Sequence, residues 1–288
     1  MPVPLETTEQ LLLDDGRTLS WRSHGPDDGR VVVHHHGGLL SGAYASTAEA
    51  GCRELGIRLL TPDRPGIGTS SPRPGRTTAD GVDDVRELLD HLGVERAGSL
   101  GWSMGGQYAV ATAALLPDRV DRLVVVAGAV PLDSPGALGQ LNRMDQRFTR
   151  QAQHRPRTAR TTFRLLGLLA RHLPKAANRS MAEGLSADDA AVVAALDARV
   201  LAGAMAEAMA QPDGMAEEYR AWARPWGVPL AASAVPATVV RGTTDALIPE
   251  EWAARLAVGL DAERDDVEGA GHLFLLTDWE RVLRPFAS

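Results

Sequence analysis

Short runs of residues that are apolar on both faces of a strand recur along this chain, separated by segments with helical spacing. A strand of this kind must be covered on both faces, which parallel strands connected by helices achieve. Helices are expected between the runs at 79–92, 104–116 and 252–260, where Gly93, Pro117 and Pro249 mark helix ends. The order predicts an α/β fold with a largely parallel sheet. The runs are 30–33, 57–60, 123–126 and 237–240.

The first strands are expected to be antiparallel instead. Segments 10–14 and 18–23 flank Asp15-Gly16, a pair that favours a tight two-residue turn. A hairpin therefore precedes the parallel strands.

A helical insertion is predicted at 134–226, between core parts at 1–133 and 227–288. Strand-like runs are missing there, and Ala, Leu, Met and Arg recur with helical spacing. Ser186-Ala187-Asp188-Asp189 resembles a capping box and predicts the start of a long helix. Apolar residues recur along that helix at intervals of three and four residues: Val193, Leu196, Val200, Ala204 and Ala208.

The insertion also carries a concentration of positive charge. Between Asn142 and Ala182 there are ten Arg and Lys residues against one acid, Asp145. One interpretation is a solvated helix face. The other is a basic rim that attracts an anionic substrate.

The net charge of the whole chain and its cysteine content limit the classes of protein to which it can belong. A net charge of -7 argues against a nucleic-acid surface and favours a small-molecule substrate as the partner. The single cysteine, Cys52, excludes an internal disulfide and a multi-cysteine metal site, and is interpreted as an apolar filler. Segment 1–15 lacks the features of a signal peptide, and no apolar run is long enough to span a membrane. We expect a cytoplasmic protein without a membrane partner; a homodimer is left open.

The turn Gly101-Trp102-Ser103-Met104-Gly105 is the strongest chemical signal. A strand-like segment at 97–100 leads into it, and the helix expected at 104–116 follows. A strand that turns abruptly into a helix strains the residue at the turn and exposes its side chain above the sheet. Ser103 is therefore the candidate nucleophile.

A serine nucleophile needs a base and a carboxylate that orients the base. His272 is the candidate base because it lies in the glycine-rich loop 269–272, after an expected strand at 263–268. The candidate carboxylate is Asp245, which closely follows the strand at 237–240 and so lies at its carboxyl end. Asp133 is the alternative, since either acid satisfies the chain order of serine, acid and histidine.

An oxyanion would be stabilised by two backbone N–H groups. Met104 supplies one at the start of its helix, and Gly38 supplies the other from the loop after the strand at 30–33. That loop begins with His34-His35-His36. His34 and His36 would share a face of a strand and could chelate a metal, but no spaced acid or cysteine partner is evident, so we predict no metal and expect His36 to brace the loop.

Four segments together resemble the α/β-hydrolase superfamily over nearly the whole core. The resemblance implies an eight-stranded sheet, a helical cap inserted after the sixth strand, and a substrate pocket between cap and core. It also implies that Asp245 occupies the usual position of the triad acid. We expect no cofactor. The four segments are His36-Gly37-Gly38, Asp63-Arg64-Pro65-Gly66-Ile67-Gly68-Thr69-Ser70, Gly101 to Gly105, and Gly242-Thr243-Thr244-Asp245 with Gly271-His272.

The resemblance favours hydrolysis of a carboxylic ester through an acyl-enzyme on Ser103. Aspartate, the nucleophile of similar dehalogenases and epoxide hydrolases, is absent at this position. Cleavage of a carbon–carbon or amide bond, ring closure without hydrolysis and an inactive ligand-binding protein are the alternatives. The predicted substrate-binding side chains, some of which could instead form the core of the cap, are Trp102, Leu39, Leu166, Met205, Met209 and Trp222.

Overall fold

The computed structural model describes residues 8–287, so residues 1–7 of the predicted first core part and of segment 1–15 lie outside it. Eight strands of the described chain form one sheet in the order β1-β2-β4-β3-β5-β6-β7-β8. The strands are β1 (Glu9–Leu12), β2 (Thr18–His24), β3 (Arg30–His35), β4 (Ile57–Pro62), β5 (Ala97–Trp102), β6 (Val120–Val126), β7 (Ala237–Gly242) and β8 (Glu263–Val267).

The direction of the strands follows their apolar pattern. β1 pairs with β2, and β2 with β4, in antiparallel register, whereas the strands from β4 across to β8 are parallel. Central strands such as β5 and β7 are buried along their whole length, while the edge strand β8 is partly exposed. The predicted fold class, an α/β fold with a mostly parallel eight-stranded sheet flanked by helices, is confirmed.

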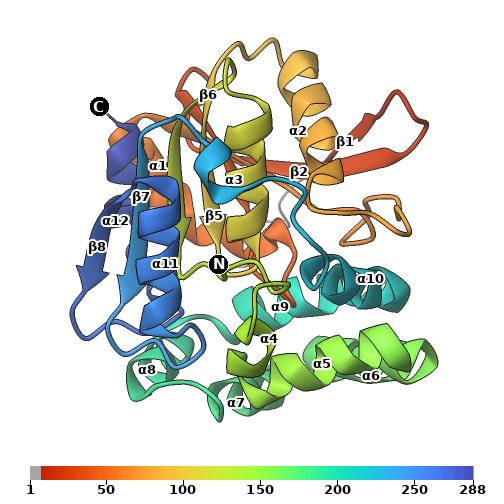
Figure 1. Cartoon of the computed structure of the whole chain (residues 1–288). Helices are drawn as coiled ribbons and strands as arrows, with labels where there is room; N and C mark the ends of the chain where they lie inside the picture. The colour runs from red at the N-terminus through yellow and green to blue at the C-terminus, as the bar shows by residue number, and fades with distance from the viewer. Residues whose placement is uncertain (1–7, 288) are drawn as a thin grey trace.

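Helices cover both faces of this sheet (Figure 1). Helix α1 packs against α12, and α2 packs against α3, which in turn contacts β5 and β6. These helices are α1 (Glu49–Leu55), α2 (Asp80–His91), α3 (Gly105–Leu115), α11 (Glu250–Leu260) and α12 (Trp279–Leu283). Short 3-10 helices occur at η1 (Gly42–Ala48), η2 (Leu230–Ala232), η3 (Phe274–Leu276) and η4 (Arg284–Phe286).

A second group of helices lies between β6 and β7 in the chain. Figure 1 shows it beyond one end of the sheet, on the side toward which the arrowheads of β7 and β8 point. We call these the cap helices, and the predicted limits 134 and 226 enclose them; the division into core and cap stays a prediction. They are α4 (Ala137–Gln140), α5 (Arg143–His154), α6 (Pro156–His172), α7 (Pro174–Ala182), α8 (Ala187–Ala195), α9 (Ala198–Ala208) and α10 (Pro212–Trp222).

The prediction of one long helix after Ser186 is wrong. Ser186 does cap a helix, because its side chain accepts a hydrogen bond from the Asp189 N–H. Helix α8 ends before Leu196, whose ψ of 150° is extended, and Asp197 then caps α9 by accepting from the Arg199 N–H. An aspartate at this position satisfies a free donor of a new helix start, which competes with continuation of the old one.

Within residues 8–287, no helix combines the length and apolar character that crossing a bilayer requires. Cys52 is a buried, free thiol in α1, packed in the main hydrophobic cluster.

Candidate active site

Ser103 lies on the turn between β5 and α3. Its φ of +55° is in the left-handed region, which is uncommon for a residue with a side chain and is a local strain typical of functional sites. The turn requires glycine on both sides of it. A Cβ atom at Gly101 would lie 2.6 Å from the Gly105 carbonyl oxygen, and one at Gly105 would overlap the His35 carbonyl oxygen. A side chain at either position would therefore clash with the backbone, so the sharp turn from β5 into α3 requires both glycines.

Asp245 and His272 meet above the carboxyl ends of β7 and β8. His272 Nδ1 lies 2.9 Å from Asp245 Oδ2, and both side chains are buried. The other oxygen, Asp245 Oδ1, accepts hydrogen bonds from the backbone N–H groups of Leu247 at 2.8 Å and Ile248 at 3.0 Å. Both oxygens of the Asp245 carboxylate thus accept hydrogen bonds. Because Nδ1 of His272 is bonded to Asp245, Nε2 is the ring nitrogen that could exchange a proton with Ser103.

The charges of this pair support each other. Burial pushes the pKa of His272 down, but the charge and hydrogen bond of Asp245, together with the charges of Asp189 and Asp145, outweigh burial and leave the pKa raised above 6.5. Burial pushes the pKa of Asp245 up, but His272 and two backbone donors outweigh it and leave that pKa lowered. Asp245 therefore favours its anionic form, and this anion stabilises the protonated form of His272.

Asp133, the alternative acid, is exposed and forms no hydrogen bond with His272 in the described part of the chain. It lies in the segment between β6 and α4, two residues beyond Pro131. The geometry therefore pairs the candidate base with Asp245.

The two candidate oxyanion donors border the same cavity as Ser103. Met104 is the N-cap residue of α3, so its N–H lies at the positive end of that helix. Gly38 belongs to the loop after β3, where the next residue, Leu39, has a φ of +63°. The backbones of Gly38 and Met104, each with an N–H group, thus border the same cavity as Ser103.

Arg64 fastens the loop of Gly38 to the cap helices. Its guanidinium donates to the carbonyl oxygens of His36 at 2.7 Å and Gly37 at 3.2 Å, and its Nε donates to Glu218 of α10 at 2.6 Å. Glu218 also accepts a hydrogen bond from Arg76. Arg64 of segment 63–70 therefore forms a buried ion pair with the cap and hydrogen bonds with the loop of Gly38.

The three consecutive histidines have separate structural partners. His34 Nε2 lies 2.8 Å from the Tyr44 hydroxyl, His35 Nε2 lies 3.3 Å from the Thr112 hydroxyl, and His36 Nδ1 lies 2.9 Å from the Gly37 carbonyl oxygen. Burial lowers the pKa of His36 well below its ordinary value. Among residues 8–287 there is no group of three or more acids, histidines or cysteines that could hold a metal ion.

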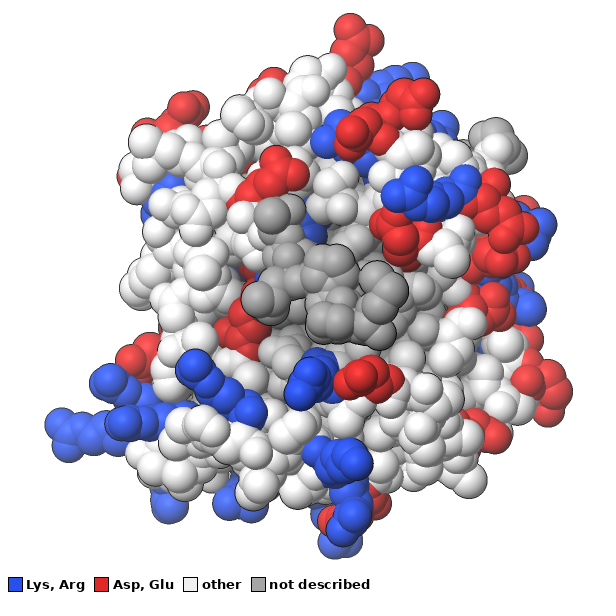
Figure 2. Space-filling model, turned by 180° about the vertical axis from the view of Figure 1, so that it is seen from behind, with Lys and Arg blue, Asp and Glu red and all other residues white. Residues whose placement is uncertain are grey.

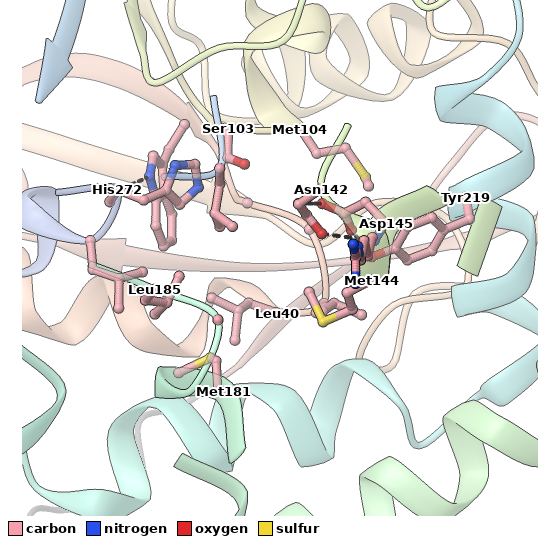
Figure 3. Close-up of a pocket in the computed structure, with 18 of the residues that line it drawn as sticks. Leu40, Ser103, Met104, Asn142, Met144, Asp145, Met181, Leu185, Tyr219 and His272 are labelled. Carbon is pink, nitrogen blue, oxygen red and sulfur yellow. Dashed lines mark hydrogen bonds between the residues drawn. The ribbon is translucent and has the colours of Figure 1, made fainter. Parts of the chain in front are cut away.

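A cavity of about 470 Å³ lies between Ser103 and the cap helices (Figure 3). Of the predicted substrate-binding residues, Leu39, Trp102 and Trp222 line it. The sequence did not indicate several further apolar side chains, which come from the core and from the cap. These are Leu40, Met144, Met181, Leu185, Leu247 and Leu273.

Leu166, Met205 and Met209 do not line this cavity, and their role in substrate binding stays a prediction. They border an adjoining space of about 70 Å³, which shares Leu39, Met144, Ser180 and Met181 with the cavity. The physical reason is that α6 packs directly against α9, so apolar side chains on these helices fill the space between them.

A polar cluster occupies the side of the cavity opposite His272 in Figure 3. Asp145 accepts hydrogen bonds from Asn142 Nδ2 at 2.6 Å and from the Tyr219 hydroxyl at 2.8 Å. Burial raises the pKa of Asp145 despite these bonds. Nothing in the sequence pattern points to this cluster. Asn142 and Asp145 have the spacing of a helix start, and Asn142 caps α5, but that spacing carries no information about the cavity.

The arginines of α5 border an open groove of about 520 Å³ beside the cavity, and Arg143 lines both. No ion pair involves Arg143, Arg147, Arg150 or Arg155 within the described residues. Figure 2 shows Lys and Arg side chains gathered at the cap end of the molecule. Asp145, on the same helix, points into the cavity, so the acid and most of the arginines of α5 lie on different faces of the helix.

Known proteins resemble this chain in structure and, over part of its length, in sequence. The structure resembles that of bromoperoxidase from Bacillus anthracis with a TM-score of 0.74 and 20% identity, covering 97% of this chain and 98% of that one. The sequence is 32% identical to proline iminopeptidase from Arabidopsis thaliana over 127 residues, which are 43% of this chain and 33% of that protein. It is 31% identical to a bifunctional esterase/perhydrolase from Acinetobacter calcoaceticus over 120 residues, 41% of this chain and 44% of that protein.

These sequence matches are partial, since the chain spans between 31% and 45% of the length of the first curated relatives it matches. The sequence profile described as alpha/beta hydrolase fold, in contrast, matches residues 30–278. Since that match covers most of the chain, from β3 to the residue before α12, this protein belongs to the α/β-hydrolase fold family.

Proposed function

We propose that this protein is a serine hydrolase that cleaves a carboxylic ester, or a related acyl bond, of a small to medium organic molecule. One observation carries the proposal. Ser103, on a strained turn, borders the same cavity as His272, whose Nδ1 is hydrogen-bonded to the buried Asp245. A nucleophile, a base and an orienting carboxylate in that order are what acyl transfer requires.

The reaction begins when Ser103 Oγ attacks the carbonyl carbon of the ester and His272 Nε2 takes the hydroxyl proton. Asp245 stabilises the imidazolium that forms. The oxyanion of the tetrahedral intermediate accepts hydrogen bonds from the N–H groups of Gly38 and Met104. His272 then protonates the departing alcohol, which leaves the acyl group on Ser103.

Water completes the cycle. His272 removes a proton from a water molecule, and the hydroxide attacks the acyl carbon. The bond to Ser103 Oγ breaks, His272 returns the proton to Oγ, and the carboxylic acid is released. Protein side chains supply the nucleophile and the base, so this scheme needs neither a metal nor another cofactor.

The cavity supports a substrate that is apolar near the reacting carbonyl, because Leu40, Trp102 and Leu273 border it. A relative named esterase/perhydrolase supports ester chemistry. A relative named proline iminopeptidase is the specific reason to test amides as well. The partner we propose is therefore a small molecule.

The test compares p-nitrophenyl esters with matched p-nitroanilides, using wild type and Ser103→Ala. We expect the esters to turn over faster and the variant to lose about 10⁶-fold in kcat, the scale seen when a serine nucleophile is removed. A fluorophosphonate should label the wild type on the peptide that contains Ser103. If no ester is hydrolysed and Ser103 is not labelled, the protein is not a serine hydrolase, and a ligand-binding role takes precedence.

A further inference from the structure

The first turn of helix α8 lies against the two loops that carry Asp245 and His272. Asp189 Oδ1 accepts a hydrogen bond of 2.7 Å from the N–H of Leu273, the residue after His272. The neighbouring Asp188 accepts one of 2.6 Å from the hydroxyl of Thr244, the residue before Asp245. Two adjacent acids of the cap therefore contact the chain beside the base and beside the acid.

The two contacts differ in burial. Asp189 is 0% exposed, whereas Asp188 and Thr244 are both exposed. The second oxygen of Asp189 accepts from the Ser186 hydroxyl at 3.0 Å, and Ser186 in turn accepts from the Asp189 N–H. Both oxygens of the Asp189 carboxylate are thus bonded, which fixes its orientation.

The loop of His272 is shaped to receive this carboxylate. A Cβ atom at Gly271 would overlap the carboxyl group of Asp189. A side chain at position 271 would push Asp189 and the loop apart. The glycine beside the candidate base therefore permits close contact with the cap.

Asp189 is a buried acid that has no cationic partner within the described residues. A buried carboxylate without a cation is costly unless hydrogen bonds or a nearby positive charge compensate it. The imidazolium that forms on His272 during catalysis is such a charge. Three acids face His272: Asp245 from the loop after β7, Asp189 from α8 and Asp145 from α5, and the charge of each raises the pKa of His272 against burial.

We propose that Asp189 is a positioning residue, which holds the His272 loop against the cap and adds negative charge beside the imidazolium. Movement of α8 would then displace the base, so the cap and the catalytic groups are coupled. The kinetic part of the test rests on the proposed hydrolase function.

Asp189→Asn separates charge from hydrogen bonding. Its amide oxygen can still accept from Leu273 N–H, and its NH₂ group can donate to the Ser186 hydroxyl, but the negative charge is gone. We expect the acid limb of the kcat/KM profile to move to lower pH, because His272 loses one of the charges that favour its protonated form. Asp189→Ala removes the acceptor as well and should lower kcat by about 10- to 100-fold through misplacement of the base, with a smaller change in KM.

Asp188→Asn is the matched control, since it removes an equal charge one residue away at an exposed contact. We expect its acid limb to coincide with that of wild type. Thermal unfolding of each variant checks that the fold is intact. The proposal is overturned if Asp189→Asn leaves the limb in place, or if Asp188→Asn moves it equally.

A direct titration keeps this test independent of substrate. The ring protons of His272, followed by NMR from pH 5 to 9, should give a lower pKa in Asp189→Asn than in wild type and an unchanged pKa in Asp188→Asn. If the protein turns over no ester yet the titration shifts, the hydrolase proposal fails and the role of Asp189 stands. If the enzyme is active and His272 titrates identically in all three proteins, the electrostatic role of Asp189 is wrong.

Discussion

Asp245 Oδ2 and His272 Nδ1 lie 2.9 Å apart, although 27 positions separate the two residues in the chain. Each comes from the loop after a strand, Asp245 after β7 and His272 after β8, and these strands are parallel neighbours. Carboxyl ends of adjacent parallel strands meet at one edge of a sheet, so the sheet itself brings the acid to the base.

Neutralising the acid should disable the base. Asp245→Asn is expected to lower kcat by about 10⁴-fold, since an amide favours the wrong tautomer of the histidine and cannot stabilise its charged form. Initial rates on a p-nitrophenyl ester measure the loss. Asp133→Asn is the control and should retain wild-type rates; the assignment of the acid is wrong if Asp133→Asn shows the loss and Asp245→Asn does not.

The pH dependence should report His272. Catalysis needs the neutral imidazole, and the pKa of His272 is raised above 6.5 because Asp245, Asp189 and Asp145 together outweigh burial. We therefore expect kcat/KM to fall as the pH drops through that pKa, with the midpoint of the acid limb above 6.5. The rate of fluorophosphonate labelling should follow the same limb; a midpoint below 6.5 in both measurements would contradict the prediction.

The arginines of α5 should attract an anionic substrate if they form a basic rim. We expect the p-nitrophenyl monoester of succinic acid to gain in kcat/KM relative to p-nitrophenyl butyrate, and to lose that gain as salt rises, because exposed charges are screened beyond about 10 Å at 0.1 M. The double variant Arg147→Gln, Arg150→Gln should remove the preference. Arg96→Gln, an exposed arginine just before β5, is the control. An equal salt response of both esters means that the arginines are only a solvated helix face.

Glu218 should be a larger contributor to stability than its neighbour Glu217. It is 1% exposed and pairs with two buried arginines, Arg64 and Arg76. Removal of one partner from a buried ion pair leaves uncompensated charge, so Glu218→Gln is expected to lower the free energy of unfolding by about 3 to 5 kcal/mol.

Urea unfolding measures that difference. Glu217→Gln breaks the more exposed pairs with Arg220 and Arg224 and should cost about 1 kcal/mol or less. Equal losses in the two variants would show that the link from Arg64 through Glu218 to the cap contributes no special stability.

Much of the fold is predictable because it depends on local patterns. The apolar runs at 30–33 and 237–240 lie in strands, the helix starting near Met104 ends before Pro117, and Asp15-Gly16 joins the first two strands. The turn around Ser103 is recognisable for the same reason, since the glycines that permit it are its immediate neighbours in sequence. Local patterns also mislead, as at Leu196, which fits the apolar spacing of one helix but lies at the break between two.

The sequence by itself therefore determined the class of fold, the serine at the strained turn, the candidate base His272 and the two candidate acids Asp245 and Asp133. Each follows from backbone geometry within a few residues. Tertiary packing alone decided which side chains face one another. Leu166 and Met205 pack among other apolar side chains of the cap helices, whereas Tyr219 and Asp145 line the cavity. Asp189 contacts the His272 loop at Leu273, 84 residues away in the chain. Such contacts depend on how each helix is rotated and docked, which spacing along one helix does not specify.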